Sequence, residues 1–311
     1  MTATASTPVV LLVFNRPRLT ARMLGAVRAA KPELVLVVGD GPRDTHPEDK
    51  ARCAEVRQAV EKGIDWETKV LTNFSEGNLG CRERVSSGLT WAFEQVERAI
   101  ILEDDCVPNL GFFRFCSELL QRYQDDSRIG CVTGDNFQPP GFQLEKSYYY
   151  SRYPHCWGWA SWRRAWKFYD NAMKHWPELK RIHWLSGLFS NPLHARYWEE
   201  IFDRTYTRQV DSWAYVWTYS CWSQSMLSIL PTVNLVTNVG GGGDATHCVD
   251  GPLLHRPAVP MIFPLRHPVN VLADFQADDY SQRFVFGACR PKGWRAWLPR
   301  FLTGLRPRRP L

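Results

Sequence analysis

The chain has 311 residues, of which 44% are hydrophobic and 23% are charged, and its formal net charge at pH 7 is +6. A chain of this length and apolar content can bury a large core, which excludes an intrinsically disordered protein. Seven basic residues and no acidic ones lie between Arg290 and the C-terminus, so the rest of the chain is nearly neutral. The charge is therefore terminal, which argues against a nucleic-acid-binding protein.

The first 136 residues alternate between buried strands and amphipathic helices. Continuous apolar runs predict strands over 9–14, 34–38, 69–71, 99–102 and 129–133. Helical spacing of apolar residues, or a polar run bounded by proline, predicts helices over 17–30, 47–62, 81–96 and 112–123. This alternation predicts an α/β fold with a mostly parallel twisted sheet flanked by helices.

From about residue 138 to 237 the chain is crowded with tryptophan and tyrosine. We expect at least two thirds of these aromatic side chains to fill the core, with a minority available to stack on a sugar ring. Glycines 240–243 form the only low-complexity segment, and no internal repeat is visible.

The composition also indicates the cellular compartment of the protein. No apolar stretch approaches the roughly 20 residues that span a bilayer, and the first seven residues lack the features of a signal peptide. The nine cysteines are scattered, odd in number and without a CxxC spacing, which is typical of a reducing compartment. We therefore expect a cytoplasmic protein. Its basic, tryptophan-containing tail, residues 286–311, suits peripheral contact with an anionic membrane, although a solubilising tail or a packed helix fits equally well.

Three consecutive carboxylates, Glu103, Asp104 and Asp105, follow the apolar strand predicted over 99–102. We call them the acidic triplet. Neighbouring carboxylates repel one another and lose solvation, so a divalent cation or a bound phosphate is the natural explanation of such a run. In open α/β sheets ligands bind at the carboxyl ends of strands, which is where the triplet lies. A solvated acidic turn before Pro108 is the alternative.

Several positions resemble the nucleotide-sugar glycosyltransferases of the GT-A fold. They are Phe14, Asn15 and Arg16 after the first strand, Asp40 after the second, residues 77–80 before a helix, and the acidic triplet. Residues 102–113, with their paired phenylalanines, are similar to the metal motif and following helix of the inverting N-acetylglucosaminyltransferase I type. The likeness continues through residues 131–136 and 158–159, and covers about residues 8–160, with a looser match to about 250.

The resemblance implies roles for the acidic triplet. Asp105 would bind Mn²⁺ or Mg²⁺ directly, and Asp104 would meet the ribose or a metal-bound water. Glu103 would hold the sugar or a residue that itself contacts the ligand. Hard carboxylate oxygens favour these two ions. A cation bridging both phosphates would stabilise the negative charge of the departing nucleoside diphosphate.

The resemblance also implies a nucleotide site. Asp40 would accept a hydrogen bond from the uracil ring, although a turn residue in Gly-Asp-Gly-Pro is the alternative. Arg16, with its neighbours Phe14 and Asn15, would lie near the base and phosphates. Three further nucleotide contacts are implied. The backbone at Asn78 and Gly80 can approach the ligand, and Arg84 could meet phosphate.

Inverting transfer needs a base that deprotonates the acceptor hydroxyl. By the resemblance, this base is an aspartate closely followed by tryptophan, and Asp211 is the best match although it comes later than the family's spacing. Asp135 and Asp244 are rivals. His247 follows the glycine run, in a segment that resembles the closing segment of such enzymes, and is a candidate ligand of metal or diphosphate; a structural histidine is the alternative.

Together these features predict a metal-dependent inverting glycosyltransferase that moves a sugar from a nucleoside-diphosphate sugar, expected to be a UDP-sugar, to a hydroxyl of a saccharide, lipid-linked or small-molecule acceptor. Residues 1–136 would bind the donor, residues 137–285 the acceptor, within one domain. A sugar nucleotidyltransferase is one alternative, but no glycine-rich loop follows the first strand. A non-catalytic carbohydrate-binding protein is another, and it would not require the triplet. Fold resemblance leaves retention of configuration open.

Overall fold

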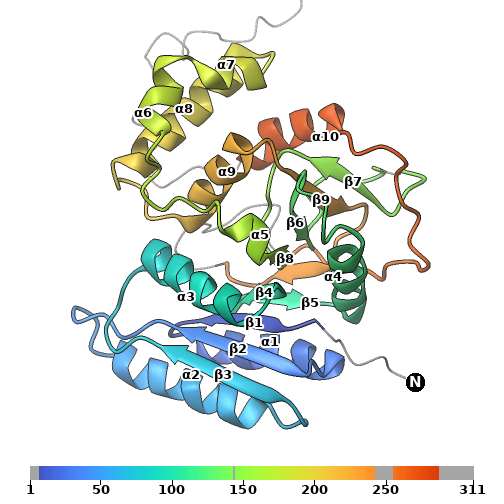
Figure 1. The fold of residues 1–311 in the computed structure, drawn as a ribbon. Coiled ribbons are helices and arrows are strands. Elements are labelled where there is room, and N and C mark those ends of the chain that lie inside the picture. The colour runs from blue at the N-terminus through green and yellow to red at the C-terminus, as the bar shows by residue number, and fades with distance from the viewer. Residues whose placement is uncertain (1–6, 143, 242–254, 287–311) are drawn as a thin grey trace, which may run out of the picture.

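The computed structural model describes residues 7–142, 144–241 and 255–286. Its centre is an eight-stranded sheet with the strand order β3-β2-β1-β4-β8-β6-β9-β7 and helices on both faces (Figure 1). Four of its seven strand pairings are parallel and three are antiparallel. The predicted α/β class with a mostly parallel sheet is therefore confirmed.

The first half of the chain builds the parallel part of this sheet. Its strands are β1 (Val9–Val13), β2 (Leu34–Gly39), β3 (Lys69–Phe74) and β4 (Arg98–Glu103). Its helices are α1 (Pro17–Ala30), α2 (Asp49–Gly63) and α3 (Cys81–Gln95). Alternate residues of β1 enter two different cores, one under α1 and α2 and the other under α3, which is why the strand is apolar throughout.

The second part of the sheet mixes both directions. Its strands are β6 (Ile129–Thr133), β7 (Tyr148–Ser151), β8 (Trp159–Trp162) and β9 (Leu227–Pro231). β8 lies antiparallel between β4 and β6, so strands from both halves of the chain share one sheet. A separate antiparallel pair, β5 (Cys106–Pro108) with β10 (Val236–Asn238), continues directly from the acidic triplet.

The remaining helices cover this second part. They are α4 (Leu110–Arg122), α5 (Arg163–Trp166), α6 (Trp176–Arg181), α7 (Trp184–Leu188), α8 (Pro192–Tyr206), α9 (Trp213–Ser223), α10 (Phe275–Tyr280) and the π-helical turn η1 (Ser281–Val285). α6, α7 and α8 form a lobe at the top left of Figure 1. In the described part of the chain, no helix combines the length and apolarity that crossing a membrane requires.

The tryptophans are mostly core, as expected. Of the ten between Trp157 and Trp222, eight are buried, and the two that stay half-buried are Trp157 and Trp184. Trp159 stacks on Trp213 with ring centroids 5.4 Å apart and an interplanar angle of 20°. The aromatic half therefore packs against the sheet, and of these ten tryptophans only Trp157 and Trp184 are not fully buried.

Candidate functional site

The strand order reverses between β1 and β4. The chain leaves β1 toward β2 and β3 and returns on the other side of β1 as β4, with Leu12 in register with Glu103. Both strands run in the same direction, so the residues that follow them meet at one edge of the sheet. Ligands of open α/β sheets bind at such a reversal, outside the carboxyl ends of the strands. We call this place the carboxyl edge.

Arg16, from the end of β1, contacts two members of the triplet at the carboxyl edge. Its Nε donates to Asp104 Oδ2 at 3.1 Å, and its Nη2 contacts both Asp104 Oδ1 and Asp105 Oδ2, the latter at 3.1 Å. Asp104 is buried, whereas Glu103 and Asp105 are half-buried. One guanidinium therefore faces three carboxylates that have little access to water.

The triplet carries more negative charge than Arg16 balances. Burial, together with repulsion from Asp105 and Asp104, raises the pKa of Glu103 to about 8. Burial also raises the pKa of Asp104, against the attraction of Arg16. Burial would lower the pKa of Arg16, but its carboxylate neighbours outweigh this effect and raise it. Perturbation of this kind marks functional sites, because stability alone does not favour it.

A second polypeptide segment closes over Asp105. The N–H of Val239 donates to the carbonyl oxygen of Asp105 at 2.8 Å, and Asn238 Nδ2 approaches Asp105 Oδ1 at 3.3 Å. A Cβ on Gly240 would lie 2.2 Å from Asp105 Oδ2, so only glycine fits there. The N–H of His255 donates to the carbonyl oxygen of Asn238 at 3.0 Å. The chain thus enters and leaves segment 242–254 beside the triplet; Asp244 and His247 lie outside the described residues.

The carboxylate oxygens of the carboxyl edge fit a cation that is bound together with the phosphates of a ligand. Among the described residues, no three His, Cys, Asp or Glu side chains are arranged as a metal cage. Mg²⁺ and ions like it are usually bound by one or two carboxylates together with substrate phosphates. The carboxylate of Asp105 is half-buried and is the triplet member with a side chain that both keeps exposed surface and contacts Arg16, which fits an ion that arrives with a diphosphate.

Asp40 ties the end of β2 to the loop before α3. Its Oδ1 accepts from the N–H groups of Gly41 and Leu79, both at 2.9 Å. Its Oδ2 accepts from Asn78 Nδ2 at 3.0 Å and from the N–H of Gly80 at 3.1 Å. These four hydrogen bonds use the lone pairs of the carboxylate, so Asp40 shapes this loop; its contact with a base stays a prediction.

Asn15 is held by a residue that the motifs did not single out. Asn15 Nδ2 donates to Asp49 Oδ1 at 2.7 Å, and Arg43 forms a fork on the same carboxylate through Nε at 2.6 Å and Nη2 at 3.0 Å. Asp49 is fully buried, which alone would raise its pKa. These hydrogen bonds, and most of all the one from Arg43, instead hold the pKa of Asp49 well below its usual range. The acid at the first position of α2 was the available signal. Arg43 also lies 5.4 Å from the centroid of the Phe14 ring.

Arg84 joins α3 to the ends of two strands. Its Nε donates to the carbonyl oxygen of Gly39 at 3.1 Å, and its Nη2 donates to Asn73, reaching the backbone oxygen and, at 2.8 Å, Oδ1. Burial lowers its pKa. The guanidinium therefore supports the loops after β2 and β3, and its predicted contact with phosphate stays a prediction.

Asp211 lies at the N-terminus of α3, although it is 130 residues away in sequence from Cys81. Its Oδ2 accepts from the N–H of Cys81 and its Oδ1 from the N–H of Arg82, both at 3.2 Å. Gly80 has a φ of +82°, and a Cβ there would lie 3.2 Å from Asp211 Oδ2. The fold thus brings Asp211, which is exposed, to the loop that Asp40 holds.

Its rival Asp135 has no exposed surface. Asp135 Oδ2 accepts from the N–H of Trp157 at 3.1 Å, and Oδ1 lies 3.3 Å from His155 Nδ1. Burial raises the pKa of Asp135 well above its usual value and lowers that of His155 to about 3. Asp135 therefore supports the turn at residues 155–158 and cannot meet an acceptor hydroxyl in this conformation. That turn carries the half-buried Trp157, whose ring stands edge-on to Phe137 at 4.9 Å.

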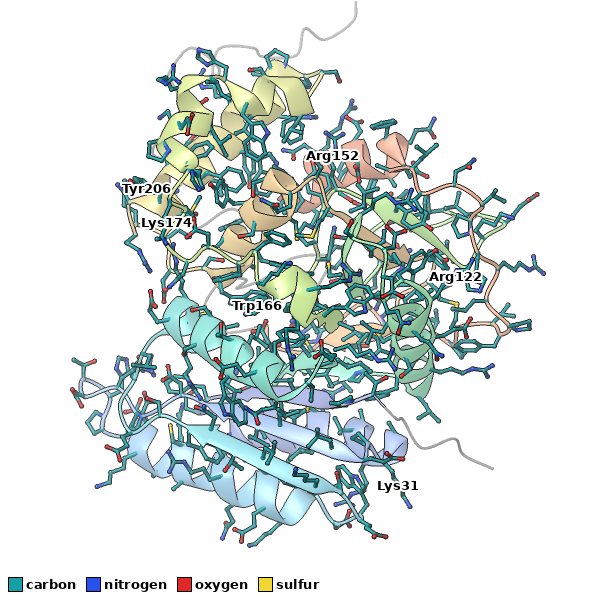
Figure 2. The ribbon with its side chains drawn as sticks, viewed as in Figure 1. Lys31, Arg122, Arg152, Trp166, Lys174 and Tyr206 are labelled. Atoms are coloured by element: carbon teal, nitrogen blue, oxygen red, sulfur yellow. The ribbon has the colours of Figure 1, made fainter. Side chains whose placement is uncertain are left out.

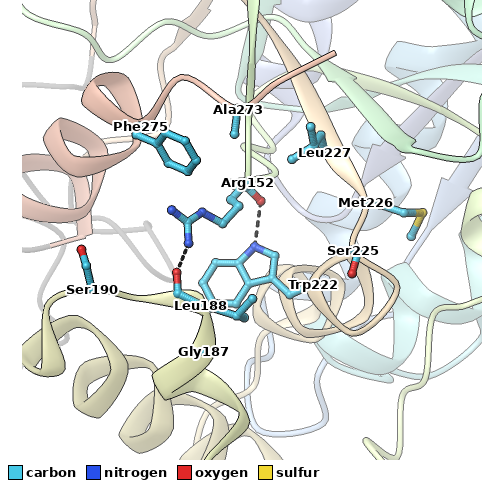
Figure 3. A pocket seen from close by; sticks show the side chains of 10 residues that line it. All are labelled: Arg152, Gly187, Leu188, Ser190, Trp222, Ser225, Met226, Leu227, Ala273 and Phe275. Carbon is cyan, nitrogen blue, oxygen red and sulfur yellow. Dashed lines mark hydrogen bonds between the residues drawn. The ribbon is translucent and has the colours of Figure 1, made fainter. Parts of the chain in front are cut away.

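A cavity of about 420 Å³ lies away from the carboxyl edge (Figure 3). It opens at the start of β9, which runs parallel to β6, whereas the triplet follows the end of β4. Arg152 projects into it, with its guanidinium on the carbonyl oxygen of Leu188, near Phe275. Arg152 is the one titratable residue among its lining side chains in the described chain, so the cavity offers no acid–base pair.

No protein-family model matches the chain, and no curated protein matches it. Among solved structures it is similar to residues 1–349 of S. aureus TarS, with 14% identity, a TM-score of 0.36, and coverage of 50% of this chain and 47% of that chain. It is also similar to mannosyltransferase PcManGT from Pyrobaculum calidifontis in complex with GDP-Man and Mn²⁺, with 11% identity, a TM-score of 0.37, and coverage of 71% and 69%.

A third similar structure is UDP-glucose pyrophosphorylase complexed with UDP-glucose, with 8% identity, a TM-score of 0.31, and coverage of 52% of this chain and 78% of that chain. This chain spans about half of the TarS chain that it matches.

Proposed function

We propose that the chain is a glycosyltransferase that uses a nucleoside-diphosphate sugar, expected to be a UDP-sugar, together with Mn²⁺ or Mg²⁺. The observation that carries the proposal is the acidic triplet at the strand-order reversal. Arg16 contacts the triplet but balances only part of its negative charge. A diphosphate would be repelled by bare carboxylates, so a divalent cation is what makes the two compatible.

Different residues of the carboxyl edge bind the ion, the phosphates, the nucleotide and the sugar of the donor. Asp105 holds the ion, which, when bound, supplies positive charge for the departing diphosphate. Arg16 lies where its guanidinium can pair with phosphate oxygens in addition to Asp104. The loop that Asp40 and Asn78 organise forms the nucleotide side of the site. Glu103 faces the sugar, in keeping with the resemblance.

Asp211 is the proposed general base of an inverting transfer. Its carboxylate is exposed and is oriented by two N–H groups at the N-terminus of α3. A base must be accessible and fixed in direction to take the proton of an acceptor hydroxyl. Trp157 is the proposed stacking surface, because it is half-buried in the turn before β8, where Trp159 pairs with Ile101 near the end of β4.

The alternative of a sugar nucleotidyltransferase is weakened by the connection after β1. Only Phe14, Asn15 and Arg16 lie between β1 and α1, and none of them is glycine. A triphosphate needs a glycine-rich loop at this position to receive its oxygens on backbone N–H groups. A non-catalytic sugar-binding protein is weakened because most of the tryptophans are buried.

Thermal melting with UDP and GDP, in the presence of Mn²⁺ or of a chelator, tests the proposal. A ligand that binds the native state raises the melting temperature by mass action. We expect UDP with Mn²⁺ to stabilise the protein, and Asp105→Ala to lose the Mn²⁺-dependent part. Asp65→Ala is the matched control, because Asp65 is an exposed surface aspartate that pairs with Arg28 at 2.9 Å. Equal stabilisation with and without chelator would contradict the metal role.

A further inference from the structure

Residues 259–272 form an extended segment, which we call the strap, along the outer side of α4. Asn109 Nδ2 donates to the carbonyl oxygen of Val259 at 2.6 Å. Further along, the Arg114 guanidinium lies 4.0 Å from the centroid of the Phe263 ring, and His267 Nε2 lies 3.5 Å from Glu118 Oε1. The strap and α4 therefore share one surface, at the right of Figure 1.

The strap exposes apolar side chains where polar ones are expected. Its inward side chains, such as Phe263 and Leu265, pack against the core under α4. Its outward side chains include Ile262, Val269 and Leu272, which are 80%, 89% and 70% exposed. Scattered exposed apolar residues are ordinary, but three large and strongly exposed ones between residues 262 and 272 of a single segment are typical of an interaction surface.

Exposed arginines lie close to these side chains, and the nearest acids along the chain are Glu118 on α4, Asp125 just after α4 and Asp274 just after the strap. Arg114 and Arg122 on α4 and Arg266 on the strap are exposed, and the labelled Arg122 lies at the end of α4 in Figure 2. Glu118 is half-buried beside His267. The sequence holds no acidic residue between Arg256 and Asp274, and the described chain ends at Phe286, ahead of seven basic residues without an acid.

We propose that this face binds the surface of an anionic lipid bilayer. Ile262, Val269 and Leu272 enter the apolar boundary of the bilayer, while the surrounding arginines meet the phosphates of the headgroups. A second copy of the chain would set these arginines against one another, which disfavours a symmetric dimer. Charge complementarity therefore selects an anionic lipid surface. The inference does not depend on the proposed activity.

Flotation of the full-length protein with lipid vesicles tests the inference. We expect the protein to float with phosphatidylcholine vesicles that contain about 30 mol % phosphatidylglycerol, and not with phosphatidylcholine alone. The variant Ile262→Ser/Val269→Ser/Leu272→Ser should bind at least about tenfold more weakly. Its melting temperature should match that of the wild type, because all three side chains are exposed.

The matched control is Val70→Ser/Ile182→Ser/Leu193→Ser, three apolar residues that are 40%, 55% and 70% exposed on other surfaces. This variant should float like the wild type. Arg114→Gln/Arg266→Gln should weaken binding and reduce its dependence on salt.

Three results would overturn the inference. The wild type could fail to float with anionic vesicles, or the strap variant could float as well as the wild type, which would assign any binding to another part of the chain. Alternatively, sedimentation could show a wild-type dimer that the strap variant converts to monomer, which would make a second copy the occupant of this face.

Discussion

The carboxyl edge and the aromatic half bury different kinds of polar group. In the aromatic half, many of them are uncharged indole N–H groups. Those of Trp162, Trp166, Trp176, Trp198 and Trp222 donate to nearby acceptors, whereas that of Trp159 has no acceptor among the described residues. At the carboxyl edge, burial raises the pKa of Glu103 and Asp104, which share a single guanidinium. Buried indoles fill the core, whereas carboxylates that are buried next to one another at a strand-order reversal indicate function.

Replacing the proposed base should have the largest effect. In Asp211→Asn the carboxamide oxygen can still accept one of the two N–H groups at the N-terminus of α3, but the side chain cannot take the proton of the acceptor hydroxyl. We expect the transfer rate to fall by about 10²–10⁴-fold, with Mn²⁺-dependent UDP binding retained in calorimetry. Asp65→Asn is the control. Unimpaired turnover of Asp211→Asn would remove Asp211 from the mechanism.

Opening the aromatic core should destabilise the protein without changing the carboxyl edge. Trp198 is fully buried and its Nε1 donates to Gln282 Oε1 at 2.7 Å. Trp198→Ala should lower the free energy of unfolding by about 3–5 kcal/mol in denaturant titrations. Below its lower melting temperature the variant should bind UDP and Mn²⁺ normally. Weaker binding there would mean that the two regions are coupled.

Removing the Arg16 guanidinium should change the affinities for Mn²⁺ and for UDP in opposite directions. In Arg16→Gln, Asp104 and Asp105 lose the positive charge of the guanidinium, so Mn²⁺ should bind more tightly when nucleotide is absent. UDP should bind about tenfold more weakly, since a charge-assisted contact to phosphate is lost. Calorimetry measures both constants. Arg43→Gln, which removes the guanidinium from Asp49, is the control, and equal changes in both variants would contradict a specific role for Arg16.

The pH dependence of stability should give the smallest signal. The folded-state pKa of Glu103, about 8, exceeds its ordinary value of about 4.3. The folded state thus binds more protons than the unfolded state between these values. The contribution of protonated Glu103 to stability is complete below about pH 4.3 and is lost as the pH rises through about 8. Glu103→Gln should flatten the decline of the melting temperature over this window; an unchanged slope would show that Glu103 does not titrate there.

Local patterns were sufficient for the elements whose signals lie within a few residues. The predicted helix over 17–30 coincides with α1, where Pro17 begins the helix and Lys31, with a φ of +44°, follows its end. β4 is longer than the predicted strand by one residue at each end and ends at Glu103, the first acid of the triplet. No element of the second half beyond β6 was predicted, including α8 and α9, which have 15 and 11 residues. The pairing of β8 with β4 joins segments about sixty residues apart, which periodicity does not encode.

The sequence by itself determined the α/β alternation and the presence of three acids at the end of a buried strand, because apolar periodicity and adjacent charges are local properties of the chain. Only the tertiary structure decided which groups meet those acids. Arg16 reaches Asp104 across 88 positions and Asp211 reaches the N-terminus of α3 across 130. Such contacts depend on strand order and helix placement, which are set by the packing of the whole core.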